Sequence, residues 1–597
     1  MNRNAVASFR RTARAAARAR PRGPRAGTAR RLAPTAFAAA LWLASPATAQ
    51  AQQAAPVQGG NPLATLPGAP GQQPPAVEPD LRLRVTPAPP AADDLLAREV
   101  VPRRFDIAGV RSVPFEDVAK IFVPLSGQSV TVARIVEVGR AVTALYQQRG
   151  FALSFAFVPP QDFRDGAVRV VVVEGHIRAV AIEGDAGPAE PRLRALAAEI
   201  VRDKPLRTAT FDRYTQLMSR LPGVTVGAQA AQPTTTDGGT ELKLTVRRQP
   251  YNVSLGADLR QPTPRGVLSG QWNDPIPFLP GGQLSASALL GDFQKERFGN
   301  LAYSQLVGDE GLTLRAAVSH YRGRPDVGAT SPLLRREVTN RRLDLGASYP
   351  WLLDRNRALT FSGGFYAADN ADEYRNRLTG AALAEDVRVR ALTAQAAWVA
   401  TGATRSRSAT VSVSQGIDGL GASAENRINF AGVPAANPAR LDFSRIAFDA
   451  AQRDRHAGRW GTALSAAGQY SPHIVPVTER VSFGGSRFGR GYAPGEIAGD
   501  AGLGVAGEVN RAVPLDGGRW LQQLEPYLLL EAARVHSRLA PARDARLRSV
   551  ALGLRLTDNR HYALDLAAAK PTGDPSPNNP ERRIRLSLLL SYQFDAP

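Results

Sequence analysis

Apolar and polar residues alternate with a period of two in many short runs between residue 251 and the end of the chain. In the run that begins at Tyr251, apolar residues oppose polar or small ones, and the run 584–594 has the same pattern. Because successive side chains of a β-strand point to opposite faces, each run predicts a strand with one apolar face. We count about 16 such strands, near residues 251, 266, 283, 299, 312, 341, 359, 387, 406, 443, 461, 502, 524, 548, 561 and 584.

The connections between these strands alternate in length. Those after even-numbered strands are mostly short, whereas several after odd-numbered strands are long: 322–340, 368–386, 416–441 and the connection that contains Arg490. A soluble sandwich shares the side-chain alternation, but short turns at one rim and long loops at the other are typical of a bacterial outer-membrane barrel. We therefore predict a membrane β-barrel of about 16 antiparallel strands over residues 249–597. An even strand number returns both ends to the periplasmic rim, which places the Arg490 loop on the outer side, after the eleventh strand.

Two similar modules precede the barrel, at residues 101–175 and 176–248. In each, the pattern predicts the order strand, helix, helix, strand, strand. For example, apolar residues recur with helical spacing within 131–149, and Gly150 ends that helix. An open sheet edge can accept an extended peptide as an added strand. The modules could equally be rigid spacers, and the sequence leaves both interpretations open.

The N-terminus has the layout of a secretory signal peptide. Residues 1–31 are basic, 32–43 are apolar, and small residues follow, so cleavage is expected after Ala49 or Ala51. An organellar transit peptide is the alternative, because the segment is rich in Arg and lacks acids. We assign residues 1–49 to the signal peptide and 50–100, rich in Pro, Gln and Ala, to a linker.

Composition excludes several classes of protein. The net charge is +21, but ten Arg lie in the first 49 residues, and no basic tract interleaved with aromatics indicates nucleic-acid binding. The chain has no Cys, and its six His are widely spaced. It lacks the G-x-S-x-G and G-x-x-x-x-G-K-[ST] motifs. We therefore predict no enzyme activity, catalytic residue, metal site or cofactor.

The segment 481–502 is unusually rich in Gly and contains Gly489, Arg490, Gly491 and Tyr492 in succession. The flanking glycines would let the backbone pass close to another element while Arg490 reaches a buried acid. The alternative is an exposed surface loop.

Taken together, these segments resemble the two-partner-secretion transporters, the TpsB class of haemolysin secretion/activation proteins, which carry POTRA modules before a barrel of 16 strands. The matching motifs are Gly150-Phe151, 166–170 and 173–175 in the first module, 221–224 and 239–242 in the second, and 489–492 with Gly499-Asp500 in the loop. The resemblance implies two periplasmic POTRA-like α/β modules. It covers nearly the whole mature chain, although only 93–100 offers a helical candidate for the family's plug helix.

In this family the loop folds into the lumen, and its Arg pairs with an acid on the inner barrel wall. The resemblance therefore implies lumen-loop roles for Gly489, Arg490, Gly491, Tyr492 and Asp500. After Pro526-Tyr527, the wall motif places Glu531 where the family usually has Asp, Leu529 where it has an aromatic residue, and Ala533 where it has Gly. Alternatively, Glu531 lines a wet lumen beside Arg534. Phe594 would serve as the assembly signal, although three residues follow it.

The implied function is an outer-membrane pore that recognises, secretes and can activate one large unfolded exoprotein without nucleotide. The expected partners are this exoprotein, outer-membrane lipid and the barrel-assembly machinery for the chain's own insertion, with no nucleic acid. An alternative is an assembly factor of the same superfamily, although such factors usually carry three or more modules; a passive porin or adhesin would need none. Whether the exoprotein is a haemolysin, an adhesin or an iron-acquisition protein stays open.

Overall fold

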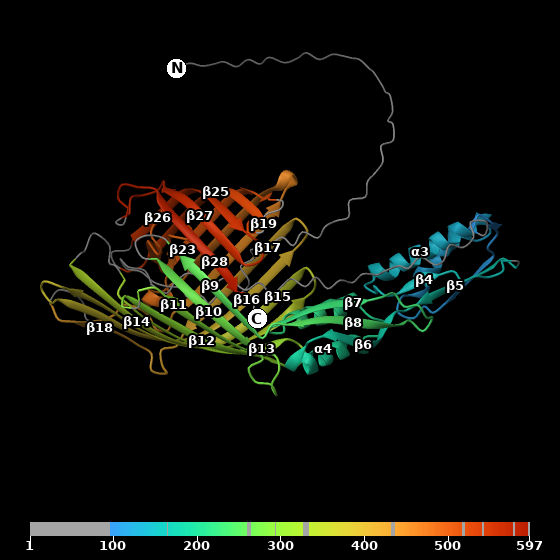
Figure 1. The fold of residues 1–597 in the computed structure, drawn as a ribbon, viewed down its shortest axis with the longest axis horizontal. Helices are drawn as coiled ribbons and strands as arrows, with labels where there is room; N and C mark the ends of the chain where they lie inside the picture. The colour runs from blue at the N-terminus through green and yellow to red at the C-terminus, as the bar shows by residue number, and fades with distance from the viewer. Residues whose placement is uncertain are drawn as a thin grey trace, which may run out of the picture. The chain divides into compact units, whose positions relative to one another are not determined.

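The computed structural model describes residues 96–594, except 164, 260–263, 293, 326–332, 431–435, 516–519, 540–542 and 577–578. Figure 1 shows its elements in chain order. The predicted signal peptide and most of the predicted linker lie outside the described residues. Of the candidate helix 93–100, the last two residues form the strand β1 (Glu99–Val100) instead. Within the described ranges, no helix combines the length and apolar character needed to cross a membrane.

The first module has the predicted order of elements. Its sheet has the order β2-β5-β4, with β2 parallel and β4 antiparallel to β5. The helix α3 begins where the Thr131 side chain accepts a hydrogen bond from the Arg134 N–H (3.3 Å), and it buries Ile135 and Val142 against the sheet. The elements are β2 (Arg104–Ala108), α2 (Phe115–Phe122), η2 (Val123–Leu125), β3 (Val130–Thr131), α3 (Val132–Gln148), β4 (Phe155–Phe157) and β5 (Ala167–Val173).

Glu174, one of the motif residues, holds the first module together. Its carboxylate accepts hydrogen bonds from the N–H groups of Arg111 (2.9 Å) and Ser112 (2.7 Å) and from the Tyr146 hydroxyl (3.0 Å). Burial and the bond to Glu174 raise the pKa of Tyr146, so its hydroxyl stays protonated and donates. One carboxylate thus joins the end of β5, the loop after β2 and the helix α3.

The second module repeats the arrangement, with the sheet order β6-β8-β7. The strand β8 is central, β6 is parallel to it and β7 is antiparallel. Its elements are β6 (His176–Gly184), η3 (Gly187–Ala189), α4 (Glu190–Arg202), α5 (Thr208–Ser219), β7 (Val224–Ala230) and β8 (Gly239–Arg248). The strands β7 and β4 therefore each form a sheet edge within their modules.

The described residues from 251 to 594 form a closed antiparallel barrel, as predicted. Two of its strands are interrupted: β17 and β18 both pair with β16, and β23 and β24 both pair with β25, so the segments make 16 strands. Pairing of β28 with β9 closes the barrel, from Leu589 opposite Asp258 to Phe594 opposite Val253.

The segments of the barrel are β9 (Tyr251–Asp258), β10 (Arg265–Asn273), β11 (Gly282–Leu290), β12 (Glu296–Val307), β13 (Leu312–Gly323), β14 (Leu334–Leu353), β15 (Arg357–Asn376), β16 (Ala382–Thr401), β17 (Arg405–Gly416), β18 (Ser423–Ile428), β19 (Ser444–Arg455), β20 (Trp460–Tyr470), β23 (Ala501–Arg511), β24 (Val513–Pro514), β25 (Gln523–Ser537), β26 (Arg543–Thr557), β27 (Tyr562–Pro571) and β28 (Arg585–Phe594). The tight turn η4 (Ala457–Arg459), in which Gly458 has a φ of +70°, joins β19 to β20.

Two of the predicted long loops are largely strand. Most of the described residues in the ranges 322–340 and 368–386 lie in β13 to β16, of which β14, β15 and β16 have 20 residues each. Their charged residues pair across neighbouring strands, as Arg336 and Asp372 do at 2.6 Å with each side chain 3% exposed. Cross-strand pairing therefore keeps a polar sequence in strand conformation. Similarly, β18 occupies part of the predicted loop 416–441.

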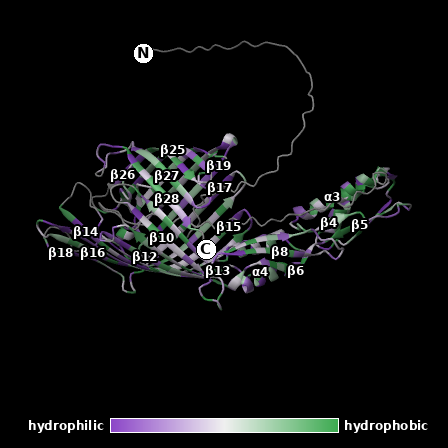
Figure 2. Cartoon of the chain, viewed as in Figure 1, coloured by the Kyte–Doolittle hydropathy of each residue, from purple (hydrophilic) through white to green (hydrophobic). Residues whose placement is uncertain are grey.

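Apolar and polar residues are interspersed along the barrel strands, as the hydropathy colouring in Figure 2 shows. Exposed large apolar residues such as Leu314, Phe361 and Leu530 recur at every second position and mark the outer face. Buried or half-buried charged pairs such as Arg336–Asp372 and Arg555–Glu508 lie on the opposite, inner face. This distribution meets the requirement of a barrel with lipid outside and a polar lumen inside.

Candidate functional site

The connection 471–500 follows the eleventh strand, as predicted, and folds back into the barrel. It contains η5 (Val477–Glu479) and a small hairpin of β21 (Val481–Phe483) and β22 (Ile497–Gly499). Phe483 and Tyr492 are 0% and 1% exposed, and they pack with Val535 and Leu547 of the barrel wall. The interpretation of this segment as an exposed surface loop is therefore wrong.

Asp500 holds the end of this connection against the barrel wall. Its fully buried carboxylate accepts hydrogen bonds from the N–H groups of Val475 (3.0 Å) and Arg538 (2.7 Å). The Arg480 guanidinium lies 3.4 Å from the same carboxylate. A buried charge needs such partners, and here they tie both ends of the connection to one side chain.

The two glycines let the tip of the loop approach the wall. Gly489 has a φ of +151°, and a Cβ there would lie 3.2 Å from a Leu547 methyl group. A Cβ on Gly491 would lie 2.7 Å from the Pro571 backbone nitrogen. Tyr492 then donates a hydrogen bond to the Asp574 carbonyl oxygen (3.2 Å). The tip is thus seated against the end of β27 and the chain after it.

Arg490 contacts the wall through two different groups. Its backbone N–H donates to Glu531 Oε2 (2.7 Å), which also accepts from the Ser549 hydroxyl (2.7 Å). Its guanidinium donates to the Tyr527 hydroxyl oxygen and lies 3.3 Å from Asp565 Oδ2. The predicted guanidinium–Glu531 pair is thus corrected: Glu531 binds the Arg490 backbone, and Asp565 is the acid that the guanidinium meets.

The alternative for Glu531 also fails. Glu531 is 7% exposed on the inner face of β25, whereas Arg534 lies on the outer face, where it pairs with Asp544. Leu529 and Ala533, the other two motif positions, are buried on the same face as Glu531. Ala533 packs with Tyr492 in one cluster, so a small residue there leaves room for the loop.

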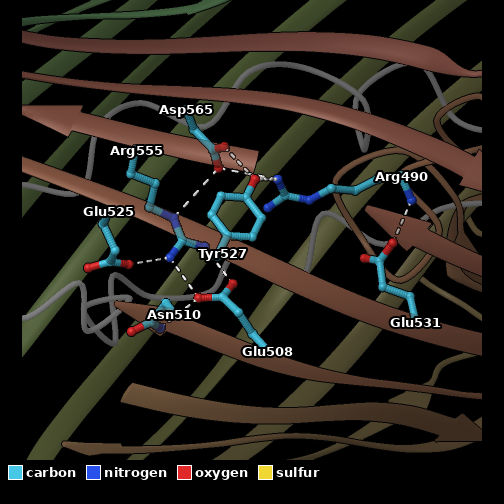
Figure 3. A network of polar contacts seen from close by, with 8 residues as sticks. All are labelled: Arg490, Glu508, Asn510, Glu525, Tyr527, Glu531, Arg555 and Asp565. Atoms are coloured by element: carbon cyan, nitrogen blue, oxygen red, sulfur yellow. Dashed lines mark hydrogen bonds and ion pairs between the residues drawn. The ribbon is translucent and has the colours of Figure 1, made fainter. Parts of the chain in front are cut away.

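The Arg490 contacts belong to a larger charged network, drawn in Figure 3. The Tyr527 hydroxyl donates to Asp565 Oδ1 (2.6 Å), and its ring lies 4.2 Å from Arg555 Cζ and 5.5 Å from Arg490 Cζ. Arg555 donates two bonds to Glu508 (2.7 and 2.6 Å) and one to Glu525 (2.7 Å). Strands β23, β25, β26 and β27 each contribute a member, so the Arg490 contacts are part of a network that spans four strands.

Most of this network is not predicted by the sequence patterns. Tyr527 belongs to the Pro-Tyr motif, whereas the sequence patterns do not single out Asp565, Arg555 or Glu508. In the structure, Arg555 lies directly opposite both Glu525 and Asp565 in the neighbouring strands. The available signal was that opposite charges occupy inner-face positions of consecutive strands, but the register that aligns them cannot be read from one strand alone.

A second buried contact holds the beginning of the loop against a different part of the wall. Glu479, 2% exposed, accepts a hydrogen bond from the Tyr366 hydroxyl of β15 (2.9 Å) and pairs with Arg445 of β19 (3.0 Å). Gln469 and Arg445 also donate to the Glu479 carbonyl oxygen. The connection is thus anchored at its beginning on β15 and β19 and at its tip on β25 to β27.

Phe594 lies at the end of β28, where it is opposite Val253 of β9 and packs edge-to-face with Tyr592 at 4.8 Å. Its role as an assembly signal stays a prediction. Among the described residues, no three His, Asp or Glu side chains form a group that could hold a metal ion.

We expect Gly491→Ala to release the tip of the loop. The added Cβ would meet the Pro571 backbone, and overpacking of this kind costs roughly 1–3 kcal/mol. Trypsin cleavage after Arg487 or Arg490 should therefore become about tenfold faster in the folded protein. Gly270→Ala is the matched control, because a Cβ there meets nothing within 4 Å; equal cleavage rates in both variants would contradict the tight seating of Gly491.

Comparison with known proteins supports the predicted fold. The family model "POTRA domain, ShlB-type" matches residues 100–175, and the model "Haemolysin secretion/activation protein ShlB/FhaC/HecB" matches residues 294–556. The outer membrane transporter CdiB of Escherichia coli is 24% identical over 206 residues, which are 34% of each chain. The match therefore spans about a third of the length of this curated relative.

Two solved structures share the fold over most of the chain. The structure of CdiB from Escherichia coli is similar with a TM-score of 0.64 and 18% identity, over 87% of this chain and 95% of that one. The structure of CdiB from Acinetobacter baumannii has a TM-score of 0.54 and 16% identity, over 85% and 93% of the two chains. At these identities the likeness concerns the fold alone.

Proposed function

The chain belongs to the haemolysin secretion/activation family ShlB/FhaC/HecB, and from this premise we propose that it is the pore of a two-partner secretion system. Its barrel lies in the outer membrane, and its POTRA modules lie in the periplasm. The pore exports one large exoprotein in an unfolded state. It does so without nucleotide, and folding of the exoprotein outside the cell gives the transport its direction.

The observation that carries this proposal is the loop 471–500 inside the lumen. Its tip is held by Arg490 through one ion pair at 3.3 Å and a few hydrogen bonds, with the two side chains of the pair 15% and 19% exposed. Contacts of this kind can break and re-form in a partly wet lumen, because water takes the place of each lost partner. Arg490 would thus keep the lumen closed at rest and allow the loop to move when the exoprotein enters.

The modules supply a means of recognising the exoprotein. The strands β4 and β7 each lie at an edge of their module's sheet. An edge strand presents unpaired backbone groups that bind an extended peptide by strand addition. We propose that the exoprotein's N-terminal secretion signal binds in this way before the chain enters the barrel.

The second candidate is a factor that inserts other proteins into the outer membrane. It is favoured by the short closure of the barrel between β28 and β9, where the described residues form six residue pairs, from Leu589–Asp258 to Phe594–Val253. Assembly factors usually carry three or more modules, whereas the described residues upstream of β9 form two. The count of modules therefore favours secretion.

Deletion of residues 105–248 tests the proposal. In a strain without this protein, we expect the exoprotein to accumulate in the periplasm, and the deletion variant should fail to restore its secretion while the full chain restores it. Heat-modifiable mobility in electrophoresis would show that the shortened barrel is assembled. Normal secretion in the null strain, together with depleted outer-membrane proteins, would overturn the proposal and establish the assembly factor.

A further inference from the structure

The outer surface of the barrel carries a groove of about 730 Å³ over β11 to β16. Its lining includes three outward-facing apolar side chains, Leu301, Val318 and Leu343, which are 47%, 49% and 38% exposed. It also includes small residues, among them Gly299, that leave the surface hollow. The groove therefore lies on the face that contacts lipid.

Strand register arranges the lining in two rows. In one, Leu301, Val318, Leu343 and Ala367 are consecutive cross-strand neighbours. In the next row towards the outer rim, the consecutive neighbours are polar or small: Gly299, His320, Arg341 and Asp369. Arg388, opposite Asp369, continues this row beside the groove. The groove thus crosses the boundary between an apolar band and a charged band.

The height of this boundary follows from strand geometry. Arg341 and the 69% exposed Trp351 lie ten residues apart on β14. At about 3.4 Å per residue and a strand tilt of about 40°, the vertical separation is roughly 26 Å. This equals the height of the apolar band of an outer-membrane barrel, about 25 Å. With Trp351 at the periplasmic interface, Arg341 is level with the headgroups of the outer leaflet.

The charged row has an excess of positive charge. Asp369 is bound by Arg390 (2.8 Å), which also lines the groove. Arg341 and Arg388 are exposed, and neither has a hydrogen bond or ion pair with any other residue in the described ranges. The nearest acid further along the outer face of β16, Asp386, pairs with Arg427. Two guanidinium groups therefore lie at headgroup level without a counter-charge of their own.

We propose that this groove binds a phosphorylated, multiply acylated lipid of the outer leaflet, that is, lipid A of lipopolysaccharide. Its acyl chains occupy the apolar row at Leu301, Val318 and Leu343, and its phosphates bind Arg341 and Arg388. Guanidinium groups bind phosphate oxygens through pairs of charge-assisted hydrogen bonds. Clusters of basic residues at membrane depth recognise anionic headgroups in the same way.

The test uses the purified full-length protein in detergent and bisphosphorylated, six-chain lipid A as the probe, with bound lipid counted by native mass spectrometry. We expect one lipid A per wild-type chain. The double variant Arg341→Gln/Arg388→Gln should bind about tenfold more weakly or worse, since each basic residue near a membrane surface contributes about 1 kcal/mol. Arg407→Gln is the matched control: this exposed Arg belongs to the outer face of β17 at the opposite rim, and its replacement should leave binding unchanged.

A second variant tests the apolar part of the groove independently of charge. A Cβ on Gly299 meets nothing within 4 Å, so Gly299→Leu fits the folded barrel and fills the groove. It should weaken lipid A binding while Arg341 and Arg388 remain. Heat-modifiable mobility would confirm that each variant is folded.

Three outcomes would overturn the proposal. Unchanged binding by the double variant or by Gly299→Leu would place the lipid elsewhere. Equal binding of dephosphorylated and bisphosphorylated lipid A would mean that the groove binds acyl chains without recognising the phosphates. Displacement of lipid A by an equal concentration of inorganic phosphate would mean that the arginines form a site for a free anion.

Discussion

Arg490→Ala is expected to abolish secretion of the exoprotein while the barrel still assembles. The variant loses the guanidinium contacts with Tyr527 and Asp565, which are the charged side-chain contacts between the tip of the loop and the wall. Breaking a buried pair costs roughly 3–5 kcal/mol, and the partly wet lumen lowers this value. Asp565 keeps Arg555 at 3.8 Å and the hydrogen bond from the Tyr527 hydroxyl at 2.6 Å, so it is not left without a partner and the barrel should fold.

The measurement is the amount of exoprotein at the cell surface, normalised to the amount of assembled barrel in the outer membrane. Arg487→Ala is the matched control, because this Arg lies in the same loop but is 40% exposed and pairs with a half-exposed Asp449. Its replacement should change secretion little, since exposed pairs contribute about 0–1 kcal/mol. Secretion at the wild-type level by Arg490→Ala would refute the role of the anchor.

Because Glu531 binds the Arg490 backbone and Asp565 faces its guanidinium, replacements of these two acids should have different effects in the same assay. Glu531→Gln keeps a carbonyl oxygen that can accept the Arg490 backbone N–H, whereas Asp565→Asn removes the charge that faces the guanidinium. Asp565→Asn should therefore impair secretion more than Glu531→Gln. The reverse order would mean that Glu531 is the functional partner despite the observed geometry.

The second large effect is expected for Arg555→Ala, and it concerns the stability of the barrel. Arg555 lies within 3.8 Å of three carboxylates, those of Glu508, Glu525 and Asp565. Its removal would leave these like charges close together on the inner wall. Because removal of one partner from a buried pair costs roughly 3–5 kcal/mol, the variant should lose its heat-resistant mobility in electrophoresis at a clearly lower temperature than the wild type.

Arg534→Ala provides the control for this prediction. Arg534 also belongs to a barrel strand and has an acidic partner, but the two side chains are 58% and 36% exposed on the outer face. Its replacement should shift the transition little, as expected for an exposed pair. Equal transition temperatures for the two variants would show that the lumen is too wet for Arg555 to matter.

Local patterns in the sequence located most strands and helices of this architecture. Alternation with a period of two located the 16 strands, and helical spacing with Gly150 after it located α3, because these signals depend only on neighbours along the chain. The Gly-rich segment around Arg490 indicated a close approach of backbone to another element. The glycine at 491 indeed allows the contact with the Pro571 backbone.

Which residues contact one another inside the lumen depends on the tertiary structure. The sequence could not separate Glu531 from Asp565 as the acid facing the Arg490 guanidinium, because their distance depends on the register of β25 to β27 and on the path of the loop. Nor could it reveal that polar stretches around Arg336 and Asp372 remain strand, since their pairing joins residues 36 positions apart. Periodicity is a local property and fixes faces, whereas register and loop path arise from contacts between distant segments.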